Sequence, residues 1–192
     1  MQTLPHAKVQ RLAAVRALVV LTSLVTCVGL GCSVEENLPV EGVLLDHSDW
    51  RLAIEDEDPW ADRLDPLAGS CAELAWRVEG TGDAALLEVE TSECPGAAVS
   101  HSVEGLLRPG DTVSFILWHL PLVKPDVATA RLGIALDGVP VWTMDVLLPA
   151  EATVYQSSFV VPADLSQPEF LTIHVDNHGS NSWRFYTFEY AR

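Results

Sequence analysis

Residues 128–147 read ATARLGIALDGVPVWTMDVL. Two apolar-rich runs, Ala128 to Leu136 and Val139 to Leu147, meet at Asp137-Gly138. Asp-Gly between such runs is the strongest short-range signal of a tight β-hairpin, because both turn residues must accept a positive φ. The stretch therefore predicts two antiparallel strands and directs the rest of the chain toward a β fold.

Seven further runs have the length, and in most cases the two-residue alternation, of half-buried strands. Gly, Pro and Asp turns separate them, as at Gly80 to Asp83 and Arg108 to Asp111. The runs are Leu74–Val78, Ala85–Val89, Val99–Val103, Thr112–His119, Val154–Val161, Phe170–Val175 and Trp183–Tyr190. With the hairpin they make about nine short strands and no convincing helix, which predicts an all-β, antiparallel two-sheet β-sandwich over residues 43–192.

The N-terminal segment has the layout of a secretory signal. Lys8, Arg11 and Arg16 precede an apolar run of 14 residues, Ala17 to Leu30, and no acidic residue lies before it. That run is shorter than the roughly 20 residues that a transmembrane helix needs. Residues 1–31 are therefore predicted to be a signal peptide.

The run ends in Gly29-Leu30-Gly31-Cys32, which resembles the lipobox of bacterial lipoproteins, although Gly29 stands where the family usually has Leu or Val. The resemblance implies that Cys32 is lipidated, becomes the new N-terminus and anchors the protein to the membrane. Ser33 is not the Asp that retains such proteins in the inner membrane, so an exported, lipid-anchored protein of the outer membrane is favoured. The alternative is an ordinary secretory signal that leaves Cys32 as a thiol or disulfide partner.

The negative net charge of the chain restricts the classes of ligand that it can bind. The chain has 11 Lys and Arg against 27 Asp and Glu, and its net charge of −16 becomes −19 once the leader's three basic residues are removed. Such a chain repels nucleic acid and anionic lipid headgroups, which leaves cations or neutral ligands such as sugars.

Two cysteines, Cys71 and Cys94, remain after the leader and the lipidated residue are set aside. In an exported chain they are expected to form a disulfide bond. The alternative is two buried thiols.

The segment before the strands is acidic and lacks steady periodicity. Residues 32–42 are interpreted as a tether, whereas Trp50 and Trp60 indicate that residues 43–67 pack as an irregular or short-strand edge of the domain. The cluster Glu55-Asp56-Glu57-Asp58 offers carboxylates for Ca²⁺, but it lacks the spacing of an EF-hand. A solvated acidic loop is the alternative.

The end of the chain carries a second resemblance. The sequence from Phe170 to Tyr190, FLTIHVDNHGSNSWRFYTFEY, looks like the closing hairpin of galactose-binding-like jelly rolls, the fold of many carbohydrate-binding modules. Residues Gly110 to Trp118 are similar to the strand that those modules place after a Pro-Gly turn. The resemblance covers roughly Cys71 to Arg192 and supports a jelly-roll fold more than a function.

One candidate metal site lies in this region. His174, Asp176 and His178 share parity, so they are expected to project from one face of a strand, and two imidazoles with a carboxylate can bind Zn²⁺. The alternative is a polar row on an exposed sheet face.

A candidate glycan site combines flat aromatic rings with polar donors and acceptors. The aromatic candidates are Trp118, Trp142, Trp183, Tyr155 and Tyr186, and the polar candidates are His119, Asp176, Asn177 and Asn181. Trp183 lies in an Asn/Ser loop and is predicted to be exposed, whereas Trp76 and Trp118 are predicted to belong to the core.

Enzyme motifs such as Gly-x-Ser-x-Gly and His-Glu-x-x-His are missing from the sequence. The sequence therefore predicts a lipoprotein of the cell envelope with a non-catalytic, ligand-binding β-sandwich, the ligand most compatible with it being a carbohydrate. No cofactor is expected beyond Ca²⁺ or Zn²⁺. The alternative is a structural lipoprotein that contacts another envelope protein and takes no small ligand.

Overall fold

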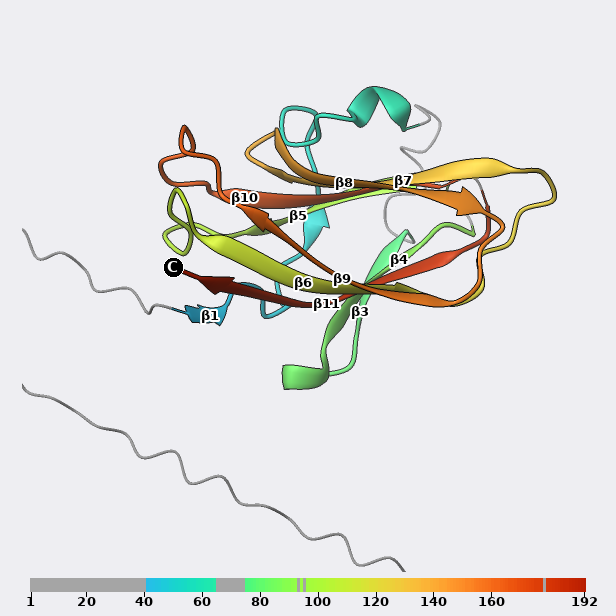
Figure 1. Ribbon diagram of the computed structural model, residues 1–192, viewed down its shortest axis with the longest axis horizontal. Helices are drawn as coiled ribbons and strands as arrows, with labels where there is room; N and C mark the ends of the chain where they lie inside the picture. The colour runs from blue at the N-terminus through green and yellow to red at the C-terminus, as the bar shows by residue number, and fades with distance from the viewer. Residues whose placement is uncertain (1–40, 65–74, 93, 95, 178) are drawn as a thin grey trace, which may run out of the picture. The chain divides into compact units, whose positions relative to one another are not determined.

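A computed structural model describes residues 41–64, 75–92, 94, 96–177 and 179–192. These residues form two antiparallel sheets that face each other (Figure 1). The first, sheet A, has the strand order β3-β4-β11-β6-β9, with β1 paired to the end of β11. The second, sheet B, has the order β2-β5-β10-β7-β8.

The strands have the following bounds. Sheet A contains β1 (Glu41–Val43), β3 (Trp76–Glu79), β4 (Leu86–Glu90), β6 (Thr112–His119), β9 (Thr153–Val160) and β11 (Ser182–Ala191). Sheet B contains β2 (Arg51–Leu52), β5 (Gly96–Ser102), β7 (Ala128–Leu136), β8 (Val139–Leu148) and β10 (Phe170–Asp176). Two short 3-10 turns are η1 (Ala61–Arg63) and η3 (Gly82–Ala84).

The order of the last eight strands identifies the fold. They are arranged as β4-β11-β6-β9 opposite β5-β10-β7-β8. Successive strands cross between the sheets, except for the β7–β8 hairpin, and this is the arrangement of an eight-stranded jelly roll. The predicted all-β, two-sheet sandwich is confirmed, and the nine predicted strands correspond to β3 through β11.

The hairpin forms at the predicted turn. Asp137 has a φ of 47° and Gly138 a φ of 75°, as the mirror-image turns of two-residue hairpins require. The Asp137 carboxylate also accepts the backbone N–H groups of Glu169 and Phe170, at 3.1 and 2.9 Å, and so fixes the turn to the start of β10.

The core lies between the sheets and is built by the alternation of side chains along each strand. On β10, Leu171, Ile173 and Val175 face the core and are fully buried. Aromatic rings fill the middle: Phe115 stacks on Phe188 with centroids 5.3 Å apart. The residues between these positions face outward and form the two outer surfaces.

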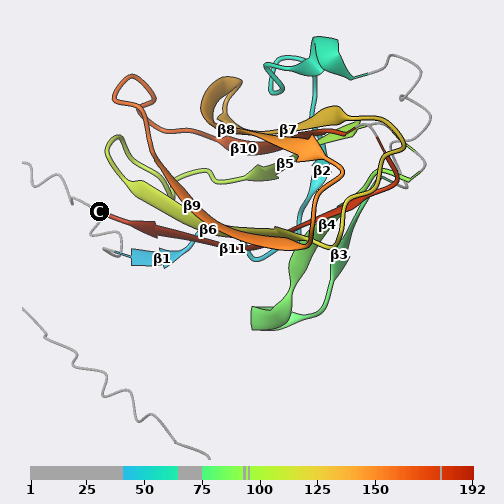
Figure 2. The same cartoon turned by 45° about the vertical axis from the view of Figure 1, so that its right-hand side comes forward.

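Two segments extend over the outer surfaces. Residues 53–64, here called the strap, run from β2 through η1 and lie on the side of sheet B that faces away from sheet A (Figure 2). The β3–β4 hairpin, with η3 near its tip, projects from sheet A in the opposite direction (Figure 2).

The N-terminal predictions fall largely outside the described residues. Cys32 and Cys71 are not among them, so lipidation and the disulfide stay predictions, although Cys94 is buried. β1 begins at Glu41, inside the segment interpreted as a tether. Across the described ranges, no helix is both long and apolar enough to span a membrane.

Candidate functional site

The outer surface of sheet A carries a row of polar side chains. On β6, Val113, Phe115 and Leu117 are buried in the core, so Ser114 and Ile116 between them face outward. Ser114 is paired with Ser158 of β9 on one side and with Glu189 of β11 on the other. The three side chains are exposed and form a line across three neighbouring strands.

A bulge in β11 opens space beside this row. The pairing of β11 with β6 shifts register between Phe185 and Phe188, both of which are buried in the core. Tyr186 and Thr187 are the residues in between, and a bulge re-aims side chains at such a point. On the other side of β11, pairing with β4 stops at Phe185 and pairing with β1 begins only at Glu189.

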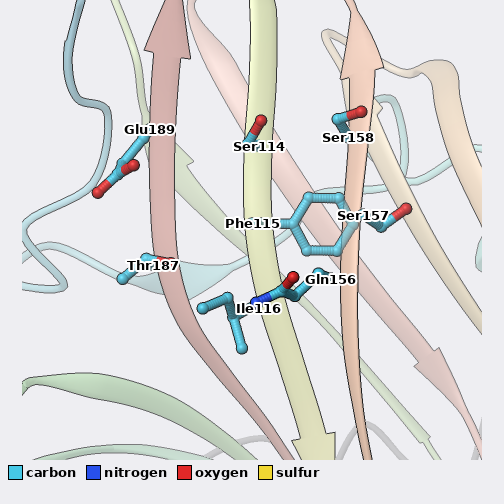
Figure 3. A pocket seen from close by; sticks show the side chains of 8 residues that line it. All are labelled: Ser114, Phe115, Ile116, Gln156, Ser157, Ser158, Thr187 and Glu189. Carbon is cyan, nitrogen blue, oxygen red and sulfur yellow. The ribbon is translucent and has the colours of Figure 1, made fainter.

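The first hollow lies over β6, β9 and β11. Its volume is about 390 Å³. Figure 3 shows that its residues come from these three adjacent strands, with Glu189 and Thr187 on one side and Gln156 to Ser158 on the other. The lining consists of Ser114, Phe115, Ile116, Gln156, Ser157, Ser158, Thr187 and Glu189.

The second hollow fills the gap that the bulge leaves between β1 and β4. Its volume is about 500 Å³, and it is lined by Val43, Leu45, Asp46, His47, Gly82, Ala85, Tyr186, Thr187 and Glu189. Thr187 and Glu189 line both hollows. We call the two hollows and the strip of β11 that joins them the β11 groove. Strands lie about 4.8 Å apart, so the part from β9 to β11 alone spans about 10 Å.

The groove contains fixed polar groups at its β1 end. The Asp46 carboxylate accepts hydrogen bonds from the side chain and backbone of Ser48, which lower the pKa of Asp46. His47 donates from Nε2 to the carbonyl of Tyr186 at 2.6 Å and accepts the Trp50 indole N–H at its Nδ1. Burial lowers the pKa of His47, so the ring is neutral at pH 7.

Next to the groove, sheet A carries an aromatic and ionic cluster. Trp118 lies on the outer face of β6, half-buried, with the Arg184 guanidinium 4.6 Å above its ring. Arg184 pairs with the buried Glu88 at 2.6 Å, and Arg77 pairs with the same carboxylate. The prediction that Trp118 belongs to the core is therefore wrong, because the residue has the outward parity of Ser114 and Ile116.

On sheet B, by contrast, the strap covers the middle of the outer surface. The Trp60 ring lies over Gly133, and the ring centroids of Trp60 and His174 are 5.4 Å apart. Glu57 of the strap pairs with Arg51 and accepts the Ser100 hydroxyl at 2.9 Å. Ser100 and His174 of sheet B are therefore bonded to the strap and do not contribute to an open platform.

The acidic cluster of the strap is divided between solvent and interior. Glu55 and Asp56 are exposed, whereas Glu57 and Asp58 are only 6% and 4% exposed. The hydrogen bond from Arg51 is the main cause of the lowered pKa of Glu57. The interpretation as a solvated loop is wrong for Glu57 and Asp58, because they bond to sheet B.

The predicted exposure of Trp183 is wrong. Its side chain is 0% exposed, and its ring meets the His119 ring edge-on with centroids 4.9 Å apart. Trp183 shares the inward parity of Phe185 on β11, which carries it into the core rather than into the preceding loop.

The predicted polar partners of Trp183 hold the loop together. Asn177 is 0% exposed and donates to the Thr91 hydroxyl at 2.8 Å. Asn181, 5% exposed, accepts the backbone N–H of Val123 at 2.8 Å and donates to the Asn177 carbonyl at 3.1 Å. Their polar atoms are occupied within the protein, so the structure does not offer them to a ligand.

Three more glycan candidates belong to the core side of the sandwich. Trp142 packs edge-on against Phe115 with centroids 5.0 Å apart. The Tyr155 hydroxyl lies 3.3 Å from Nε2 of His119, and His119 is 1% exposed. Of the predicted aromatic candidates, Trp118 and Tyr186 lie on the outer side of sheet A, and only Tyr186 lines the groove.

The metal prediction is tested only in part. His174 and Asp176 share the outer face of β10, as predicted, but Nδ1 of His174 bonds to Asp58 at 2.9 Å and Asp176 lies 3.9 Å from Arg63. His178 lies outside the described residues. Among the residues that are described, no three His, Cys, Asp or Glu side chains lie close enough together to hold a metal ion.

Sequence reasoning missed the groove residues Ser114, Gln156, Ser158, Thr187 and Glu189. One signal for the bulge was present: Phe185 and Phe188 are three residues apart, whereas regular alternation places core residues two apart. Nothing in the sequence indicated that the strap would cover sheet B and leave sheet A open.

Comparison with family models and with curated proteins gives no match. Several solved structures are similar at low identity. A carbohydrate-binding module of family 28 that is specific for non-crystalline cellulose is 13% identical, with a TM-score of 0.46, over 74% of this chain and 87% of that one. The K3 adhesin domain of Lys-gingipain from Porphyromonas gingivalis W83 is 10% identical, with a TM-score of 0.44, over 56% and 74%.

A third structure, the C-terminal family 6 module of the laminarinase LamC from Zobellia galactanivorans, is 11% identical. Its TM-score is 0.40, and the similarity covers 62% of this chain and 89% of that one. Since all three scores are below 0.5, the jelly-roll assignment is based on the strand order.

Proposed function

We propose that this domain is a non-catalytic glycan-binding module and that the β11 groove is its binding site. The observation that carries the proposal is the lining of the groove's first hollow. Its outward-facing residues include Ser114, Ser158 and Thr187, Gln156 adds an amide, and Ser114, Gln156 and Ser158 are exposed. Hydroxyl and amide groups both donate and accept hydrogen bonds, which suits the hydroxyl groups of a sugar.

The rest of the groove supports the same ligand class. Ile116 in the first hollow and Val43, Leu45 and Tyr186 in the second offer apolar surface for the C–H faces of a sugar ring. Binding sites for small ligands combine such apolar surface with a few placed polar groups. The span of the groove across several strands favours an oligosaccharide over a single sugar.

One of the two groove carboxylates is unsuited to be the acid of glycoside hydrolysis. Glycoside hydrolysis by its usual route needs a proton donor of raised pKa beside a second carboxylate. The groove holds two carboxylates, Asp46 and Glu189, and the pKa of Asp46 is lowered by its hydrogen bonds to Ser48. Asp46 is therefore unsuited to donate the proton.

A matched pair of threonine variants tests the site. The full-length protein, in mild detergent, is run in native gels that contain soluble neutral polysaccharides: hydroxyethylcellulose, xylan, laminarin or dextran. Retardation by at least one polymer is expected, and Thr187→Ala in the groove should weaken it. Thr143→Ala, an exposed threonine on the outer face of sheet B, should leave it unchanged. Loss of retardation in both variants, or in neither, would contradict the site, and no retardation by any polymer would contradict the function.

The proposal also includes the cellular location of the protein. Cys32 would carry the lipid, and the outer membrane is the expected destination. Mass spectrometry of the membrane-extracted protein should show a diacylated or triacylated Cys32, and Cys32→Ser should release the protein from the membrane fraction. An unmodified Cys32 in the extracted protein would contradict the anchor without affecting the glycan proposal.

A rival function is the docking of another envelope protein. One observation favours it: Leu120, Val123 and Val127, in the connection between β6 and β7, are 53%, 57% and 75% exposed. Exposed apolar side chains that lie together can mark an interaction surface. Under this function, Val123→Asp and Val127→Asp would abolish capture of the partner, whereas polysaccharides would have no effect on the protein in native gels.

A further inference from the structure

The charged side chains in the described lining of the β11 groove are all acidic. Its described lining contains two carboxylates, Asp46 and Glu189, and no Lys or Arg. The one imidazole, His47, has a pKa lowered by burial and is neutral at pH 7. Glu189 is exposed and lines both hollows, so its charge faces a ligand in either half of the groove.

Two cations on the same sheet face, Arg184 and Arg77, are already neutralised. Arg184 donates to Glu88 at 2.6 Å, lies 3.9 Å from Glu79 and stacks on Trp118. Arg77 pairs with both Glu79 and Glu88. Neither guanidinium lines the groove, and each faces a carboxylate of its own.

Glu189 differs from the other acidic residues of this face in its bonding partners. Glu88 is neutralised by the two arginines, and Asp46 is hydrogen-bonded to Ser48. Among the described residues, the carboxylate of Glu189 takes part in no hydrogen bond or ion pair, and it lies beside the serine row of the first hollow (Figure 3). An anionic ligand in the groove would meet this charge with no Lys or Arg in the described lining to offset it.

We propose that the β11 groove selects uncharged glycans and that Glu189 excludes anionic ones; this inference rests on the glycan-binding function proposed above. A glycan carboxylate placed over Ser114 would lie within a few ångströms of Glu189, because the two residues are paired on neighbouring strands. At such separations, the repulsion between like charges near a protein surface lowers the affinity by a factor of about five or more. Salt weakens the repulsion because the groups are exposed to solvent.

Matched polymers test the selectivity. Hydroxyethylcellulose is compared with carboxymethylcellulose, and dextran with carboxymethyldextran, each pair sharing one backbone and differing in charge. Dissociation constants for the full-length protein are measured by affinity electrophoresis at low and high salt. The variants are Glu189→Gln and, as a control, Glu104→Gln, which removes the same charge from an exposed position that does not line the groove.

The wild-type protein should bind the neutral member of a pair at least about fivefold more tightly than the carboxymethylated one. Glu189→Gln and high salt should each narrow that ratio, and Glu104→Gln should leave it unchanged. Equal binding of both members by the wild-type protein would overturn the selectivity and leave glycan binding standing. An unchanged ratio in Glu189→Gln would overturn the role of Glu189, and no binding of any neutral polymer would instead overturn the proposed function itself.

Discussion

The imidazole of His174 lies 2.9 Å from the carboxylate of Asp58, although 116 positions separate the two residues. Both side chains are buried, at 0% and 3% exposure. The pair joins the strap to the middle of sheet B. It explains why a histidine that the sequence marks as a metal ligand has a structural role, and why sheet B has no open outer face at this point.

Breaking the pair should destabilise the domain. Asp58→Ala leaves the His174 imidazole buried without its acceptor, and the loss of a buried polar partner costs roughly 2 to 4 kcal/mol. Urea unfolding measures the change. Asp56→Ala, an exposed acid of the same strap, is the control and should change the free energy of unfolding by less than about 0.5 kcal/mol. Equal effects of the two variants would show that the pair does not hold the strap.

Trp60 and Gly133 should be energetically coupled. A Cβ at position 133 would lie 2.5 Å from atoms of the Trp60 ring, so Gly133→Ala forces the indole to move. Overpacking of this kind costs about 1 to 3 kcal/mol. In a double-mutant cycle followed by urea unfolding, the cost of Gly133→Ala should shrink when Trp60→Ala is also present. Additivity within about 0.5 kcal/mol would contradict the contact.

Trp183→Ala should lower the free energy of unfolding of the domain, and it should not act through a binding surface. The ring is fully buried, and large-to-small changes of core aromatics cost about 3 to 5 kcal/mol. Trp118→Ala, at a half-buried position on the outer face, should cost less. Thermal unfolding of both variants checks this order, and a larger loss for Trp118→Ala would contradict the placement of the two rings.

Stability should fall as the pH drops below about 6.5. Burial is the main cause of the lowered pKa of His119, and it lowers the pKa of His47 as well. The unfolded chain therefore takes up protons at these two histidines before the folded chain does, which favours unfolding until the pH passes below the folded pKa values.

Urea unfolding between pH 7.5 and 5.5 measures this loss of stability. The pH range lies above that in which the carboxylates titrate. His119→Asn removes one of the two titrating groups, and the asparagine amide can still donate to the Leu120 carbonyl that His119 Nδ1 reaches. Its stability should therefore decline less steeply than that of the wild-type protein. An unchanged slope would show that His119 does not contribute.

Filling the groove should abolish glycan binding and leave the fold intact. Ser114 is exposed and lies between Ser158 and Glu189, so Ser114→Trp places an indole in the first hollow. Polysaccharide retardation should drop at least about tenfold, which corresponds to 1.4 kcal/mol. Ser102→Trp, an exposed serine on the outer face of sheet B, is the matched control. Retardation that survives Ser114→Trp would move the site elsewhere.

The strands and their turns could be read from the sequence because the signals are local. Alternation along β6 and β10 decides which side chains face the core, and Asp137-Gly138 supplies the positive φ values that its hairpin turn needs. Burial of one face fixes the register of each strand. For these reasons nine strands and a two-sheet sandwich were predictable without coordinates.

The surface left for a ligand was decided by contacts between distant segments. The strap covers the middle of sheet B because Gly133 leaves room for Trp60 and because Asp58 meets His174, pairings that no local pattern encodes. The bulge at Tyr186 and Thr187 then opens the groove on the other sheet by shifting the register of β11. The sequence by itself determined which strands form and which side chains alternate inward; the tertiary structure decided which outer face is closed, because that depends on the shapes and charges of residues more than seventy positions apart.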